Sequence, residues 1–408
     1  MSKLIGPFRE VITLANTPEK GTLSDSELEI IQNGGVLIED GKILKVGAFG
    51  DLAMEASEIE EVGDDQVLMP GLIDCHTHLV WGGTRARDYT LRMSGESYEK
   101  ILEQGGGIFD SVEKTRNASA DLLKSGLIKR ANRHLQDGVT TIEVKSGYGL
   151  DVANELKILE VIKAGKAEVE ADLIPTCLAA HVCPTEFQDK KLFLEYLEKE
   201  LLPKLLVKGL TNRVDIFVEP SAFPVEIAKS YMLAAKKLGF DLTIHADQFN
   251  TGGSQIAVEL GARSADHLEA STEKEIEILA KSDTVAVALP GASIGLGMQF
   301  TPARKLLNAG ASLAISTDWN PGSGPMGDLL VQASILGIYE KLSSAEIFSG
   351  LTFRAAKALG LHDRGRIKAG MKVDMISFPV DDYREILYNQ GKIKPIMIWK
   401  NGNRIENV

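Results

Sequence analysis

Cysteine is scarce in this chain of 408 residues. The three cysteines present, Cys75, Cys177 and Cys183, are odd in number, which argues against a disulfide-stapled secreted scaffold. Long apolar runs are missing as well: no stretch reaches the roughly 18 residues of a membrane helix, and the first residues lack the apolar core of a secretory signal. We therefore expect a cytoplasmic protein without a membrane partner.

Positive charge is also in short supply. Lysine and arginine number 45 against 57 aspartate and glutamate residues, so the formal net charge is −12. This balance argues against a dedicated nucleic-acid binder, which would neutralise phosphates with an excess of basic side chains. A hydrophobic content of 44% excludes a disordered chain, and the length allows one large domain with a smaller one.

Both ends of the chain carry short β-prone runs around tight-turn dipeptides. Asp40-Gly41 separates two such runs near the N-terminus, and Asn401-Gly402 lies in a similar pattern near the C-terminus. These dipeptides favour two-residue hairpins. We expect the two ends, residues 1–68 and 366–408, to pair into one small β domain beside a larger domain over residues 69–365.

The middle of the chain alternates short apolar runs with helix-like stretches. Eight runs have the length and composition of strands: 72–79, 140–147, 173–181, 213–220, 242–247, 264–269, 284–290 and 313–320. Eight strands with intervening helices predict an α/β fold of the (β/α)₈ TIM-like barrel type. A doubly wound parallel sheet is the alternative, but it has fewer strands, and the glycine run at 105–107 does not follow a strand.

Histidine is concentrated at the predicted strand ends. Five of the seven histidines lie there together with Asp318: His76, His78, His181, His245 and His267. Barrel active sites are built at the carboxyl ends of strands, and residues two apart on a strand share a face. Imidazole and carboxylate suit zinc or iron, so the pattern predicts one divalent metal, Zn or Fe. Its ligands would be His76, His78, His245 and Asp318.

Several segments together resemble a known superfamily. The run MPGLIDCHTHL, taken with His245, His267 and Ser316-Thr317-Asp318, is similar to the metal-dependent amidohydrolases. Within that superfamily, the segments KSGYGLD, IHADQFNTGG and TDWNPGSGP resemble the imidazolonepropionase family. The resemblance covers nearly the whole chain. It implies a barrel with a small β-sandwich domain built from both chain ends, and a homodimer.

The resemblance also implies a reaction and the residues that perform it. Members of that family hydrolyse 4-imidazolone-5-propanoate to N-formimino-L-glutamate, the third step of histidine degradation. A metal-activated water is then the nucleophile, Asp318 is ligand and general base, and His267 stabilises the oxyanion or passes a proton to the leaving nitrogen. The implied substrate contacts are Arg85, Tyr148, His181, Gln248, Asn320, Gly322 and Ser323. Arg87 and Arg92 remain alternatives to Arg85 for the substrate carboxylate.

Two other functions stay open. One is deamination of an aminated heterocycle, or ring opening of another cyclic amide. Many deaminases of the superfamily place a glutamate three residues after the histidine of strand five, whereas this chain has Gln248, whose amide cannot transfer a proton. The other is a catalytically silent metal-binding protein, against which the complete ligand set argues.

The remaining polar residues of this region have plainer explanations. His134 falls within a predicted helix and His362 lies beyond the barrel, so both are expected at the surface or in packing. Cys75 alternates with the two histidines of the first strand and faces away from them. Lys145 lies on the second strand, whereas the bridging carboxylated lysine of binuclear relatives lies on the fourth, so a structural or pocket-edge role is expected. Trp319 stands where the family commonly has phenylalanine, which affects the expected shape of the pocket.

Overall fold

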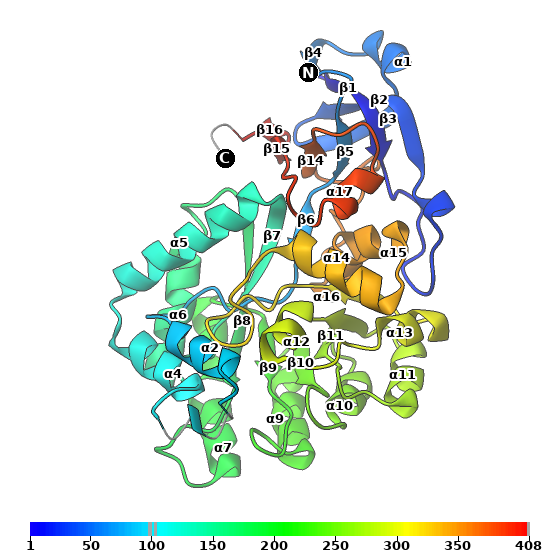
Figure 1. The fold of residues 1–408 in the computed structure, drawn as a ribbon. Coiled ribbons are helices and arrows are strands. Elements are labelled where there is room, and N and C mark those ends of the chain that lie inside the picture. The colour runs from blue at the N-terminus through cyan, green and yellow to red at the C-terminus, as the bar shows by residue number, and fades with distance from the viewer. Residues whose placement is uncertain (97–99, 102–103, 406–408) are drawn as a thin grey trace.

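Eight parallel strands from the middle of the chain pair in chain order and curve into a barrel (Figure 1). The structure is a computed structural model that describes residues 1–96, 100–101 and 104–405. Each barrel strand overlaps one of the eight predicted runs, so the predicted (β/α)₈ barrel is confirmed. The strands are β6 (Leu72–Asp74), β7 (Val139–Lys145), β8 (Asp172–Ala180), β9 (Arg213–Ile216), β10 (Asp241–Ala246), β11 (Ser264–His267), β12 (Val285–Ala288) and β13 (Leu313–Ile315).

The barrel closes through the segments that follow its first and last strands. Thr77, after β6, and Trp319, after β13, form an isolated parallel bridge. The backbone N–H of His78 donates to the Trp319 carbonyl at 3.0 Å, and the N–H of Asp318 donates to the His76 carbonyl at 3.1 Å. Closure therefore brings the polar residues after strands one and eight into direct contact.

Helices between the barrel strands and after the last of them cover the outside of the barrel. Local sequence sets where they begin: the Ser119 hydroxyl caps α5 by accepting from the N–H of Leu122, and the Asp151 carboxylate caps α6. These helices are α4 (Ile108–Asn117), α5 (Ala120–Gln136), α6 (Val152–Gly165), α7 (Lys190–Glu200), α8 (Leu202–Lys208), α9 (Val225–Lys237), α10 (Gly253–Leu260), α11 (Glu273–Ala280), α12 (Pro290–Leu296), α13 (Ala303–Ala309), α14 (Leu329–Glu340), α15 (Ser344–Gly350) and α16 (Phe353–Ala358).

A second sheet combines strands from the two ends of the chain, at the top of Figure 1. Asp40 and Gly41 have φ of 48° and 72°, and Asn401 and Gly402 have φ of 50° and 85°, as two-residue hairpin turns require. The sheet contains β1 (Lys3–Ile12), β2 (Ile30–Glu39), β3 (Lys42–Ala48), β4 (Glu58–Glu61), β5 (Val67–Pro70), β14 (Met375–Phe378), β15 (Met397–Lys400) and β16 (Asn403–Arg404). The short helices η1 (Asp25–Glu27), α1 (Phe49–Ala53) and α17 (Arg384–Tyr388) lie in the same terminal segments. Domain boundaries after residues 68 and 365 remain a prediction, and β5 continues to Pro70.

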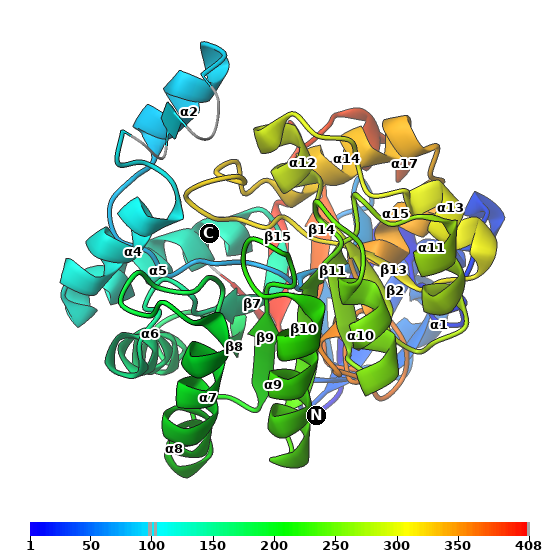
Figure 2. The same cartoon turned by 90° about the horizontal axis from the view of Figure 1, so that it is seen from below.

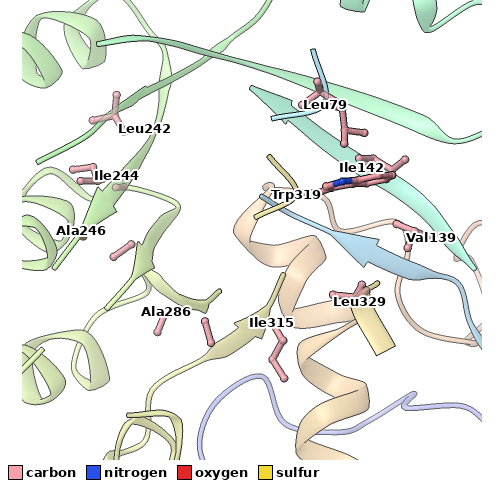
Figure 3. Packing of buried hydrophobic residues seen from close by; sticks show 14 of the residues in the cluster. Leu79, Val139, Ile142, Leu242, Ile244, Ala246, Ala286, Ile315, Trp319 and Leu329 are labelled. Atoms are coloured by element: carbon pink, nitrogen blue, oxygen red, sulfur yellow. The ribbon is translucent and has the colours of Figure 1, made fainter. Parts of the chain in front are cut away.

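The largest apolar cluster links the barrel strands to the surrounding helices. Figure 3 shows the indole of Trp319 beside Ile142 and near Leu79, among other members of this cluster. Trp319 is 6% exposed, and its ring lies 4.7 Å from that of His134, measured between centroids. The residue that follows Asp318 is therefore a packing residue that holds the closing segment in place.

One helix stands away from the body of the barrel. Figure 2 shows α2 (Ala86–Met93) projecting beyond α4 from the long connection that follows β6. Its N-cap is Arg85, which places that side chain at the base of the projection. Within the described parts of the chain, no helix is long and apolar enough to cross a membrane.

Candidate active site

The contact that closes the barrel brings a carboxylate against two imidazoles. Asp318 Oδ1 lies 3.2 Å from His78 Nε2 and 3.6 Å from His76 Nε2. All three side chains are at most 4% exposed. Burial would raise the pKa of Asp318, but the hydrogen bond and charge of His78 outweigh burial and hold that pKa below its ordinary value. The carboxylate is therefore ionised at neutral pH and available to a cation.

His245, at the end of β10, completes the predicted ligand set. Its ring lies 4.4 Å from that of His76 between centroids. The Nε2 atoms of both residues are buried and have no hydrogen-bond partner within the described part of the chain, which is costly unless they hold something else. Three imidazole nitrogens and one carboxylate are a donor set that zinc or iron accepts, so the site fits the expected metal. His267 also lies within this group: ligand atoms of His76, His245 and His267 are all within 4.8 Å of one another.

Two buried carboxylates stand behind the histidines, and sequence patterns did not single them out. Asp266 Oδ2 lies 2.7 Å from His76 Nδ1, and Asp215 Oδ2 lies 2.8 Å from His245 Nδ1. A carboxylate at Nδ1 keeps the proton there and leaves Nε2 free as a ligand. Desolvation lowers the pKa of His245 to about 4 in spite of Asp215. The sequence offered one signal for both residues, because Asp215 and Asp266 are acidic residues within predicted strand runs.

His267 has a different partner and a different electrostatic setting. Its Nδ1 lies 3.6 Å from Glu269 Oε2, and Glu269 in turn accepts a hydrogen bond from the Ser293 hydroxyl at 3.0 Å. Burial alone would lower the pKa of His267, but Glu269 outweighs it and raises that pKa above its ordinary value. The backbone of His267 is left-handed, with φ of 91°, a strained conformation for a non-glycine residue that often marks functional sites.

A pocket of about 800 Å³ opens onto these side chains. It is lined by the metal-site residues His78, His245 and Asp318 and by His267. Six of the seven expected substrate contacts also line it: Arg85, Tyr148, His181, Gln248, Asn320 and Ser323. Gly322 is not part of the lining, but a Cβ on it would approach Arg85 Nη1 to 2.2 Å. Trp319 points into the core instead, so its difference from phenylalanine does not enter the pocket wall.

The three arginines of the first connection differ in what they already bind. Arg85 Nε donates to Asp88 Oδ2 at 2.8 Å, and the two Nη atoms of Arg85 have no other partner among the described residues. Arg92 donates to the carbonyls of Gly295 and Gly322. Arg87 lies at the surface and donates to Gln104. The Arg85 side chain is 12% exposed, and Asp88 binds its guanidinium through Nε. Among the described residues, Arg85 is therefore the arginine of this connection whose two Nη atoms form a free face in the pocket.

Tyr148 and His181 form one wall of the pocket together with His78. The His181 and His78 rings stack with centroids 5.3 Å apart, and Tyr148 lies 5.8 Å from His181. His181 Nδ1 contacts the Gly147 carbonyl at 3.1 Å. Burial raises the pKa of Tyr148, which keeps its hydroxyl neutral and able to donate.

The loop after Asp318 is ordered by the Asn320 side chain. Asn320 Nδ2 donates to the Asp318 carbonyl at 2.7 Å and to Ser323 Oγ at 2.9 Å, and Oδ1 accepts from the N–H groups of Gly322 and Ser323. The amide of Asn320 is thereby occupied within the loop. The Ser323 hydroxyl lies 3.4 Å from Asp318 Oδ2. Gln248, by contrast, lines the pocket with a side-chain amide that has no partner among the described residues.

The residues that were expected to be structural lie away from the pocket. His134 is fully buried, with Nε2 3.0 Å from Asp74 Oδ2, and His362 is exposed. Cys75 faces away from the histidines and contacts the Ser316 hydroxyl at 3.0 Å. Lys145 is 1% exposed and lies beneath the metal site rather than at the pocket edge.

Comparisons with known proteins identify the family of this chain. The model of the amidohydrolase family matches residues 67–405. The imidazolonepropionase of Bacillus cytotoxicus is 42% identical over 385 residues, and that of Bacillus mycoides is 40% identical over 381 residues. Each alignment covers 92% of this chain and 90% of the relative.

Solved structures of low sequence identity share the fold. A mutant atrazine chlorohydrolase from Arthrobacter aurescens TC1, complexed with zinc and atraton, superposes with a TM-score of 0.72 at 16% identity, over 99% of this chain and 95% of that chain. An adenosine deaminase from Xanthomonas campestris with bound zinc superposes with a TM-score of 0.72 at 19% identity, over 98% and 92%.

Proposed function

This chain belongs to the amidohydrolase family, to its imidazolonepropionase branch, and we propose that it hydrolyses 4-imidazolone-5-propanoate to N-formimino-L-glutamate. In this reaction water adds to the ring carbonyl, and the bond from the carbonyl carbon to one ring nitrogen breaks. That nitrogen becomes the imino end of the formimino group, which stays on the other ring nitrogen. The observation that carries the proposal is the meeting of three histidines and Asp318 on a pocket that also holds a free arginine face.

We propose that His76, His78, His245 and Asp318 hold one divalent ion, zinc or iron. The orphaned Nε2 atoms of His76 and His245 support this ligand set. Such an ion supplies a Lewis acid that lowers the pKa of water and polarises a carbonyl. The chain's own residues then decide where protons move and how the substrate lies.

Asp318 and His267 are the residues proposed to move protons. One oxygen of Asp318 faces the histidines and the other faces Ser323, so the carboxylate can bind through Oδ1 and accept the proton of the attacking water through Oδ2. His267, whose pKa is raised by Glu269, can donate to the oxyanion or to the leaving nitrogen.

The pocket residues are proposed to orient an anionic heterocycle. The free Nη face of Arg85 suits the propanoate, because a planar guanidinium binds a carboxylate with two parallel hydrogen bonds. Gln248 offers a donor and an acceptor to the ring, and Tyr148 offers a donor. Asn320 is proposed to shape the wall through Gly322 and Ser323 rather than to touch the substrate with its occupied amide.

The experiment that tests this function compares two substrate classes. Purified protein is incubated with 4-imidazolone-5-propanoate and, separately, with aminated heterocycles such as adenosine and cytosine. We expect loss of the ultraviolet absorbance of the imidazolone without release of ammonia, and no ammonia from the aminated compounds. Ammonia release from an aminated ring, with the imidazolone untouched, would favour the deaminase alternative and overturn the proposal.

A further inference from the structure

A buried group of four charged side chains lies directly beneath the histidines. Lys145 Nζ lies 2.8 Å from Glu143 Oε1, 2.9 Å from Asp215 Oδ2 and 3.9 Å from Asp266 Oδ2. All four side chains are fully buried. We call this group, Glu143, Lys145, Asp215 and Asp266, the Lys145 cluster.

Two carboxylates of the Lys145 cluster are those that hold the histidines. Asp215 contacts Lys145 and His245 Nδ1 through the same atom, Oδ2. Asp266 Oδ2 contacts His76 Nδ1 at 2.7 Å and faces the Lys145 ammonium. The Lys145 ammonium therefore faces both carboxylates that contact the imidazoles, and one carboxylate lies between it and each ring.

Lys145 also joins strands that are not neighbours in the barrel. It extends from β7, whereas Asp215 lies on β9, one strand further than the neighbour of β7, and Asp266 lies on β11, with three strands between β7 and β11. His245 is on β10, between the two carboxylates, and is the register partner of Asp266. A single side chain across the barrel interior thus contacts two carboxylates on strands that do not pair with each other. Each carboxylate has a further partner, because Asp215 Oδ1 accepts from the His245 N–H and Asp266 Oδ2 accepts from the Thr243 hydroxyl.

We infer that Lys145 is a positioning residue for the metal site: through Asp215 and Asp266 it orients His245 and His76 so that both present Nε2 to the ion. The inference rests on the proposed metal site. A carboxylated Lys145 does not fit, because a carbamate would add a fourth negative group among three buried carboxylates. The cationic amine instead balances part of their charge.

The experiment measures metal affinity rather than activity, and the chain offers a matched control. Lys400 is 2% exposed and also holds two carboxylates, with Nζ 2.9 Å from Asp172 and 2.7 Å from Asp374, but it lies in the second sheet. Lys145→Met and Lys400→Met each remove one buried ammonium. Both proteins and the wild type are titrated with Zn²⁺ against a competing chelator, and the Co²⁺-loaded forms are compared by visible absorption.

We expect Lys145→Met to bind Zn²⁺ roughly 10–100-fold more weakly and to shift its Co²⁺ spectrum, as is typical when groups behind metal ligands are removed. Lys400→Met should lose stability but keep the affinity and the spectrum of the wild type. A folded Lys145→Met protein with wild-type affinity and spectrum overturns the inference. A wild type that binds no metal overturns the proposed function instead, and the inference with it.

Asp215→Asn covers the case in which Lys145→Met does not fold, and the double variant tests the coupling of the two residues where both single variants fold. Asp215→Asn keeps the size of the side chain and removes its charge, and we expect a similar 10–100-fold loss of Zn²⁺ affinity. Because Lys145 acts through this carboxylate, the double variant should lose less free energy of Zn²⁺ binding than the two single variants lose together. Wild-type affinity of folded Asp215→Asn, or fully additive losses, contradicts the inference.

Discussion

His181 Nδ1 lies 3.1 Å from the carbonyl oxygen of Gly147, and this contact decides which nitrogen faces the pocket. A carbonyl oxygen only accepts, so Nδ1 carries the proton and Nε2 is left as an acceptor. Desolvation, followed by the charges of His78 and His245, lowers the pKa of His181 well below its ordinary value. The ring therefore stays neutral at neutral pH and suits a substrate N–H group.

Replacing His181 with phenylalanine tests that acceptor. His181→Phe keeps an aromatic ring against His78 but removes Nε2, and a lost partner for one buried polar group costs about 1–3 kcal/mol. We expect kcat/KM for 4-imidazolone-5-propanoate to fall roughly 10–100-fold. The exposed His362→Phe variant is the control and should match the wild type. Unchanged kcat/KM in folded His181→Phe would remove His181 from the substrate contacts.

Removal of the Arg85 guanidinium should weaken substrate binding. Hydrogen bonds to charged groups contribute about 1.5–3 kcal/mol, so Arg85→Met is expected to raise KM roughly 10–100-fold with a smaller effect on kcat. Arg87→Met is the matched control, because Arg87 lies nearby but binds Gln104 at the surface. Steady-state kinetics measure both. A large rise of KM in Arg87→Met, with Arg85→Met normal, would reassign the carboxylate contact.

The Glu269 carboxylate should set the pH range in which His267 donates a proton. Because Glu269 raises the pKa of His267, Glu269→Gln lowers that pKa, and the alkaline limb of the kcat profile should move to lower pH. We expect kcat at pH 8 to fall roughly tenfold and the acidic limb to stay in place. Glu275→Gln, which alters only the cap of α11, is the control. An alkaline limb that does not move contradicts this role.

Ion pairs where the barrel meets the second sheet should make stability sensitive to acid. Burial raises the pKa of Asp363, but Arg364 and Lys372 outweigh it and hold that pKa at about 2. Asp172 is likewise lowered, against burial, by Lys400 and Arg364. A depressed pKa in the folded state means that the stabilisation is complete above the unfolded value of about 4 and is lost as the pH falls through the folded one.

The acid sensitivity is measured by urea unfolding between pH 5 and pH 2. We expect the urea midpoint of the wild type to fall as the pH is lowered over this range. The urea midpoints of Asp172→Asn and Asp363→Asn should be lower than that of the wild type at pH 5 and should fall less. Asp51→Asn, a change in the first turn of α1, is the control and should follow the wild type. Parallel pH curves for all four proteins would show that these pairs do not control acid unfolding.

Much of the fold and of the candidate metal site could be predicted from the sequence. Strand runs that end in His76, His245 and Asp318 predicted both the barrel and the meeting of these side chains, because parallel strands end at one rim. The partners of the carboxylates behind them could not be predicted: Asp215 and Asp266 are acidic residues within strand runs, but alternation alone does not reveal which histidine each contacts. Lys145 was placed correctly on the second strand, but its reach across the barrel depends on the curvature of the sheet.

The residues proposed to bind the substrate could be predicted from the sequence only in part. The sequence does not show which of the three arginines in this connection binds the substrate, and only their hydrogen-bond partners in the structure distinguish Arg85 from Arg92. Glu269 follows His267 by two residues, but the left-handed turn at His267 is what brings the two side chains together. Asn320 matched a substrate-contact motif, and its geometry shows an amide occupied within its own loop.

Metal-dependent hydrolysis of 4-imidazolone-5-propanoate is tested most directly by removing and restoring the metal while turnover is followed. Protein is stripped with a chelator, Zn²⁺ or Fe²⁺ is added back in steps, and loss of the imidazolone absorbance is measured at each step. We predict that stripped protein is inactive, that activity rises to a plateau at about one ion per chain, and that folded His245→Ala regains little of either metal or activity. Full turnover by metal-free protein, or no turnover by metal-loaded protein, would contradict the account.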